Sequence, residues 1–231
     1  MASSAMRGAD LNDPAYRAAV IDLLGVLAYG ELMAFERLAA DAALAPTISD
    51  EAELAAMANA EYRHFVMLRE RLAEMDVDPA AAMAPFREPL ERFHAMTAPS
   101  DWLEGLVKAY VGDGIGLDFY REIAGFLDPQ TSALVLEVCA DLGQSAFVVD
   151  RVRAAIADDP RVEGRLALWA RRLMGEALSQ AQHVAAERDA LTALFMGGIA
   201  GSSMDLTAIG ALLSQLTEEH SRRMQALGLS S

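Results

Sequence analysis

Apolar residues recur every three or four positions along most of the chain, which is the spacing of helices that bury one face. No stretch shows the strict alternation of a half-buried strand. We therefore expect an all-α protein. The predicted helices cover about residues 14–43, 50–75, 100–127, 130–157, 162–195 and 205–226, with a short helix near 86–96 in a proline-rich connection.

The order and spacing of these helices predict two helical hairpins joined by a long crossover, as in a four-helix bundle. We expect residues 1–13 to form a disordered tail and residues 14–231 to form one domain. The core bundle would cover residues 14–157, and two additional C-terminal helices would lie within 162–226.

Composition and charge restrict the classes of partner. The net charge of −15 repels phosphate backbones, so broad nucleic-acid binding is not expected. The single cysteine, Cys139, allows no internal disulfide and suits a reducing compartment. The N-terminus lacks the apolar region of a signal peptide, and no window of about 18 apolar residues is free of charges. We therefore expect a cytoplasmic protein without a membrane span.

Three polar residues interrupt the apolar stripes of the first two long helices. Glu31 lies on the stripe of the first helix, and Glu61 and His64 lie on the stripe of the second. A buried carboxylate must be paired, protonated or bound to metal. A Glu together with a Glu-x-x-His motif is half of the ligand set of di-iron four-helix bundles, and this donor mixture suits iron. The alternative is a buried Glu–His hydrogen-bond network without metal.

Polar residues also occupy the matching positions of the second hairpin. A shift of about 80 residues leads to Asp113, Asp141 and Gln144, which lie on apolar stripes of their own. These side chains are shorter or weaker ligands than the Glu and Glu-x-x-His of a complete second half. We therefore expect iron as the cofactor, with two ions if this second half works and otherwise one ion or none.

Four segments carry a resemblance to a known family: Glu31, "EYRH" at residues 61–64, "AYVGDGIGLDFY" at 109–120 and "CADLGQSAF" at 139–147. Together they resemble the ferritin-like superfamily over about residues 14–157. Within it, they look most like the tRNA hydroxylase family that oxidises methylthio-isopentenyl-adenosine, or its bacterial hydroxylase-like relatives. The third and fourth segments look like the ligand helices of the second half of that family's site.

The resemblance implies a non-haem di-iron centre that activates dioxygen for hydroxylation. By that implication Glu31, Glu61 and His64 hold one iron, with Glu61 bridging to a second. The partners would be dioxygen and a substrate. The acidic composition favours a small or lipophilic substrate over tRNA.

Other interpretations stay open at this point. The chain could be a catalytically decayed bundle that acts as a structural or protein-interaction module, and it could form a homo-oligomer. Iron storage is a weaker alternative. His183 could complete the metal site if the helix over 162–195 packs beside the bundle. His94 and His220 lie outside the pattern and are expected at the surface.

Three glycines, Gly112, Gly114 and Gly116, fall inside the helix predicted over 100–127. Each costs about 1 kcal/mol of helix stability relative to alanine, so a structural gain should offset them. We expect close helix packing, a π-helical bulge or space for a small substrate beside Asp113.

Overall fold

Helices make up every regular element of the computed structural model, which describes residues 10–140, 144–195 and 206–230. The prediction of an all-α fold is confirmed. A 3₁₀ turn over Ala84–Phe86 and a π-helical segment over Lys108–Gly112 join successive α-helices. The α-helices are α1 (Pro14–Ala42), α2 (Ile48–Glu74), α3 (Pro79–Met83), α4 (Arg87–Met96), α5 (Trp102–Val107), α6 (Asp113–Ala124), α7 (Pro129–Val138), α8 (Gln144–Asp158), α9 (Arg161–Glu187), α10 (Asp189–Phe195) and α11 (Leu206–Leu227).

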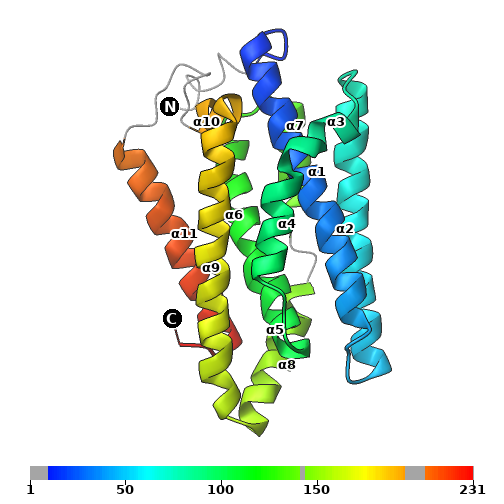
Figure 1. Ribbon diagram of the computed structural model, residues 1–231, viewed down its shortest axis with the longest axis vertical. Coiled ribbons are helices and arrows are strands. Elements are labelled where there is room, and N and C mark those ends of the chain that lie inside the picture. The colour runs from blue at the N-terminus through cyan, green and yellow to red at the C-terminus, as the bar shows by residue number, and fades with distance from the viewer. Residues whose placement is uncertain (1–9, 141–143, 196–205, 231) are drawn as a thin grey trace.

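The long helices run roughly along the long axis of the molecule. Figure 1 shows the α1–α2 hairpin at one side and α9 and α11 at the other, with α4, α5 and α6 between them. The predicted crossover is α3 and α4, which lead from the end of α2 to the start of α5. α1 packs along α2, and α5 and α6 pack against α8 and α7, as expected for two hairpins, with further helices packed on them.

Two apolar clusters form the core, one above the other along the hairpin. α1 contributes residues up to Ala28 to the first cluster and residues from Leu38 onward to the second. α2 runs in the opposite direction, so its residues up to Ala58 join the second cluster and those from Phe65 join the first. Between the clusters, both helices leave a short layer that neither apolar cluster fills.

α1 is long and apolar enough to cross a membrane by length and composition alone, since an 18-residue window has a mean hydropathy of 1.7. However, 61% of that window is buried inside the fold. The core helix of a soluble bundle has the same character, so α1 is weak evidence for a span. The expectation of no membrane span stays a prediction.

The third helix of the bundle is built from α5, the π-helical segment and α6. A π-helical turn is one of the features expected from the glycines, and it is confirmed. Close packing is confirmed as well, because a Cβ atom on Gly114 would lie 2.3 Å from Nε of Arg223 on α11. Arg223 can therefore lie directly against the α6 backbone and reach the carboxylate of Asp118.

Two helices predicted as continuous are broken. The predicted helix 130–157 ends at Val138 and resumes at Gln144, and Arg121 of α6 donates to the carbonyl of Cys139 that the helix end leaves free. The predicted helix 162–195 breaks after Glu187 at Arg188. There the side chain turns to form an ion pair with the buried Asp22 of α1.

The structure describes only the last four residues of the predicted N-terminal tail, residues 1–13. Residues 1–9 lie outside the described residues, whereas Asp10 to Asp13 form a turn. Asp13 then caps α1, because its side chain accepts hydrogen bonds from the backbone N–H groups of Ala15 and Tyr16.

Two glycines of α1 provide a test of this packing. A Cβ atom on Gly25 would lie 2.3 Å from the backbone oxygen of Ala82 on α3, whereas a Cβ atom on Gly30 would meet nothing within 4 Å. We expect Gly25→Ala to lower the free energy of unfolding by about 1–3 kcal/mol through overpacking. Gly30→Ala should leave it unchanged or raise it by up to about 1 kcal/mol. Urea unfolding measures both, and equal effects at the two positions would contradict the close approach of α3 to α1.

Candidate metal centre

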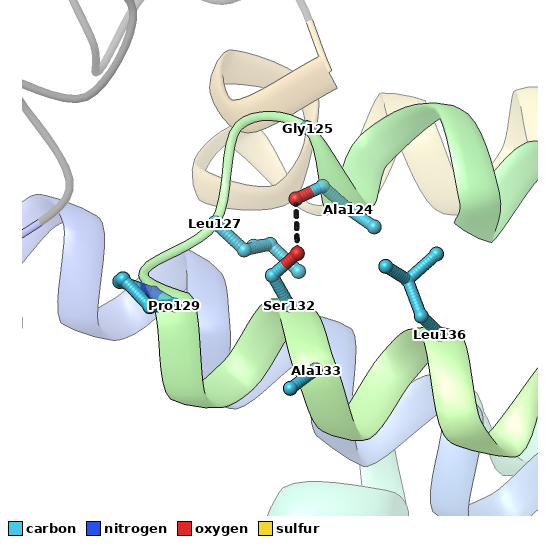
Figure 2. A pocket seen from close by; sticks show the side chains of 7 residues that line it. All are labelled: Ala124, Gly125, Leu127, Pro129, Ser132, Ala133 and Leu136. Atoms are coloured by element: carbon cyan, nitrogen blue, oxygen red, sulfur yellow. Dashed lines mark hydrogen bonds between the residues drawn. The ribbon is translucent and has the colours of Figure 1, made fainter.

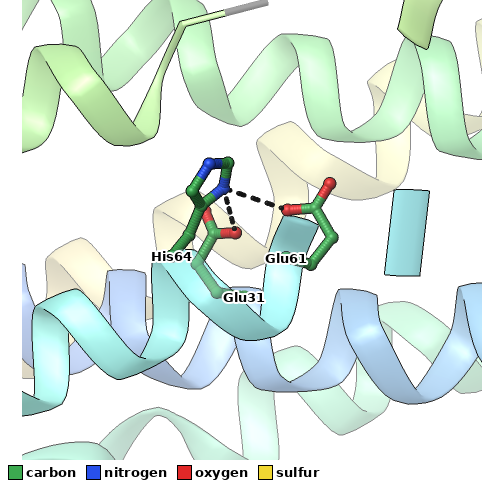
Figure 3. A group of neighbouring side chains, drawn as sticks. All are labelled: Glu31, Glu61 and His64. Atoms are coloured by element: carbon green, nitrogen blue, oxygen red, sulfur yellow. Dashed lines mark hydrogen bonds and ion pairs between the residues drawn. The ribbon is translucent and has the colours of Figure 1, made fainter. Parts of the chain in front are cut away.

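Glu31, Glu61 and His64 meet in the layer between the two apolar clusters. Glu31 projects from α1, and Glu61 and His64 project from α2 one turn apart, so that all three heads point toward one another (Figure 3). Nδ1 of His64 lies 3.3 Å from Oε2 of Glu31 and 3.5 Å from Oε2 of Glu61. One donor atom from each residue lies within 4.8 Å of the other two. We call these three residues the trio.

Helix periodicity explains how the sequence brings the trio together. A step of three residues places Glu61 and His64 on the same face of α2. The apolar residues on either side of them, Met57 and Phe65, fix that face against α1, where Glu31 stands at the same height. The side chains of the trio remain only 9%, 18% and 14% exposed for Glu31, Glu61 and His64.

The spacing of the donors suits a single cation. Carboxylate oxygens and imidazole nitrogens lie about 2.0–2.2 Å from a bound transition metal, which places two ligands roughly 2.8–3.6 Å apart for angles between octahedral and tetrahedral. The separations of His64 from the two glutamates, 3.3 and 3.5 Å, fall within that range. The same separations also suit hydrogen bonds, so either a proton or a metal ion can hold the trio together.

The electrostatics of the trio show that it attracts positive charge. Hydrogen bonds with Glu31 and Glu61 raise the pKa of His64 to about 9. Burial raises the pKa of Glu31 well above its usual value. Burial also opposes the charge of Glu61, but hydrogen bonds with His64 and Glu31 outweigh it and lower the pKa of Glu61. Without metal, the trio therefore retains protons on His64 and favours the neutral form of Glu31.

Three other buried carboxylates in the described part of the chain obtain their positive charge from arginine. Their ion pairs are Asp22 with Arg188, Asp50 with Arg151, and Glu104 with Arg165. The ion-pair partner of Glu31 is instead His64, whose charge depends on a proton. The trio thus differs from the structural ion pairs of the same bundle in a way that leaves room for a metal ion.

The second half of the predicted site is only partly described. Asp113 begins α6, and its pKa is raised well above its usual value by burial and by the charge of Glu61, while Lys108 opposes the shift. Asp113 thus lies near Glu61 but outside the trio. Asp141 lies outside the described residues, and Gln144 begins α8 with its side chain outside them. Direct metal binding by these three residues stays a prediction.

The remaining histidines do not join the trio. His183 is exposed, and its Nδ1 lies 2.7 Å from the carbonyl oxygen of Ser179 on the same helix. The surface positions expected for His94 and His220 are wrong, because His220 is only 6% exposed and Nδ1 of His94 is buried. Burial lowers the pKa of His94 to about 3 and lowers that of His220 as well.

Two further residues lie close to the site, and sequence reasoning missed one of them, Lys108. Burial raises the pKa of Tyr120, and the charge of Glu31 raises it further, which places this phenol beside the trio. Lys108 is buried next to Asp113 and was hidden inside an apolar stretch of α5 and the π-helical segment. Its presence as the only lysine in the chain is the sequence feature that could have identified it.

A cavity of about 320 Å³ lies where α6 turns into α7, lined mostly by apolar side chains such as Leu127 and Leu136 (Figure 2). Ser132 spans it with a hydrogen bond to the carbonyl of Ala124. The cavity begins about three helical turns beyond Asp113. It is therefore not the substrate space that the glycines of this helix led us to expect beside Asp113.

The raised pKa of His64 predicts a pH dependence in the metal-free protein. Folded His64 binds its proton more tightly than the unfolded residue, whose pKa is 6.5, so its contribution is complete below pH 6.5 and disappears as pH rises toward 9. We expect the free energy of unfolding to fall by about 1–2 kcal/mol between pH 6.5 and 8. Denaturant titrations should show that His64→Gln loses this slope and that His183→Gln retains it. An unchanged slope in His64→Gln would contradict the pairing.

Comparison with known proteins agrees with this arrangement. A family model described as "Ferritin-like domain, actinomycetes" matches residues 14–198, which include α1 to α10 and the whole trio. A search of curated proteins finds no significant match. Since the family match extends over most of the chain, the protein belongs to the ferritin-like domain family of actinomycetes.

Proposed function

We propose that the protein is a non-haem iron oxygenase that hydroxylates a small or lipophilic substrate. The observation that supports this function best is the convergence of two buried carboxylates and one imidazole at separations that suit a cation. The ferritin-like fold supplies the context, since bundles of this type hold iron between facing helices with this donor set.

The donor chemistry of the trio fits iron. Glu31, Glu61 and Nδ1 of His64 would hold the ion, a mixture of carboxylate oxygen and imidazole nitrogen that suits a redox-active transition metal. Bound iron would supply the electrons that activate dioxygen. The protein side of the site would hold that chemistry in a layer closed above and below by apolar side chains, which limits access of water.

The type of substrate follows from charge and resemblance taken together. The motifs of the chain resemble the tRNA hydroxylase family, whose substrate is a polyanion. The net charge of −15 disfavours such a substrate, because a negatively charged surface repels phosphates. A small or lipophilic molecule meets no such barrier.

A second candidate is a decayed bundle that no longer needs metal. It is favoured by the protonated state of the trio, because an imidazolium at His64 balances the carboxylate of Glu61 while burial favours the neutral form of Glu31, so that no ion is needed. In that case the protein acts by association with itself or with a partner, and substitutions in the trio change only stability.

Iron binding distinguishes the two candidates. After anaerobic ferrous loading and desalting, we expect the wild type to retain iron and to consume dioxygen when a reductant is supplied. Loss of groups that merely support a ligand typically weakens metal binding by 10–100-fold, so His64→Ala and Glu31→Gln should each weaken it by about 100-fold or more. Elemental analysis and an oxygen electrode measure both effects.

His183→Gln serves as the matched control, because this histidine is exposed and lies away from the trio. It should bind iron and consume dioxygen as the wild type does. A wild-type protein that takes up no iron under these conditions would exclude the oxygenase and leave the decayed bundle. Iron uptake that survives His64→Ala unchanged would show that the metal binds elsewhere.

A further inference from the structure

The chain has a single lysine, Lys108, and the fold buries it. The other 18 of the 19 Lys and Arg residues are arginines. Lys108 is only 7% exposed. Its Nζ donates a hydrogen bond of 2.7 Å to the carbonyl oxygen of Thr97 and lies 5.5 Å from the ring centre of Phe93. A buried ammonium is costly, so its retention needs a nearby negative charge.

The π-helical segment determines which residue stands in line with Lys108. In an α-helix, residues five apart point about 140° away from each other, whereas a π-helical turn pairs position i with position i+5. The segment begins at Lys108 and ends at Gly112, directly before Asp113. The extra residue of this turn therefore brings Lys108 and Asp113 toward the same side of the helix.

The charges around Lys108 agree with this placement. Asp113 and then Asp41 stabilise the ammonium, against the burial that lowers the pKa of Lys108 to about 8. Asp41 of α1 also has Arg37 nearby, whereas the charged groups that act on Asp113 are Glu61 and Lys108. The charge on Asp113 is therefore influenced both by Glu61 of the trio and by the lysine.

We propose that Lys108 is a built-in cation that takes the place of a second metal ion beside Asp113, so that each chain binds one divalent cation rather than two. The ammonium supplies positive charge at the second half of the site, where Asp113 stands without the imidazole of a complete ligand set. Because this role requires that the trio binds the first ion, it depends on the proposed function.

The number of metal ions bound per chain tests whether Lys108 takes the place of a second ion. We expect anaerobic equilibrium dialysis with Mn²⁺ or Fe²⁺ to give one bound ion per chain for the wild type. Lys108→Met keeps the length of the side chain and removes its charge, so it should bind a second, weaker equivalent that neutralises Asp113. Lys108→Arg keeps a charge and should bind one. Adding Asp113→Asn to Lys108→Met should abolish the second equivalent.

Each result decides between the two proposals. No bound ion in the wild type would overturn the proposed function, and Lys108 would then have no metal to replace. Two ions in the wild type would overturn the role of Lys108 and leave the proposed function intact. One ion in both the wild type and a folded Lys108→Met would also overturn that role, because something other than the lysine would then exclude the second ion.

A measurement on the wild type covers the possibility that Lys108→Met does not fold. Since the chain has one lysine, incorporation of ¹³Cε-lysine gives a single NMR signal for this site. We expect one equivalent of paramagnetic Co²⁺ to shift that signal, a second equivalent to shift it no further, and diamagnetic Zn²⁺ to leave it nearly in place. A signal that Co²⁺ does not shift, or that keeps shifting up to two equivalents, would overturn the proposal.

Discussion

Buried negative charge is the constraint on which the rest of this bundle depends. A carboxylate that is removed from water must be paired with a positive charge or be protonated, because the desolvation cost is several kcal/mol per ion. Most buried acids here solve the problem with arginine. Arg188 and Arg223 reach back from the C-terminal part of the chain to Asp22 on α1 and Asp118 on α6. The helices added to the four-helix bundle therefore do more than cover it, since they deliver its counter-charges.

The trio is the place where this solution is not used. Glu31 and Glu61 face each other across a layer that two apolar clusters enclose, and the positive group between them is a histidine. An arginine there would fix the charge permanently, whereas an imidazole can exchange its proton for a metal ion. On the other hairpin, the ammonium of Lys108 stands near Asp113. The two halves thus have related acids but different sources of positive charge.

Sequence periodicity was sufficient for the class of fold and for the trio, and the reason is local. Glu61 and His64 share a helix face by their spacing, and Glu31 interrupts an otherwise apolar stripe. It was not sufficient where distant segments decide the structure. At the break, Arg188 pairs with Asp22, which is far away in the chain, and the burial of His94 and His220 depends on neighbours from other helices, such as Arg37 and Arg171. The pairing of Lys108 with Asp113 could not be predicted from α-helical spacing, because only a π-helical turn brings the two residues to the same side of the helix.

The protonation of the trio is itself an indication of what the site can bind. Two carboxylates and a neutral imidazole carry two negative charges, which is the charge that one divalent cation neutralises. In the metal-free protein the same neutralisation comes from protons, one held by His64 and another favoured on Glu31 by burial. A metal ion entering the trio would displace these protons, so its affinity should rise with pH. A purely structural ion pair, such as that of Asp50 with Arg151, has no comparable exchange to offer, because arginine does not release its proton.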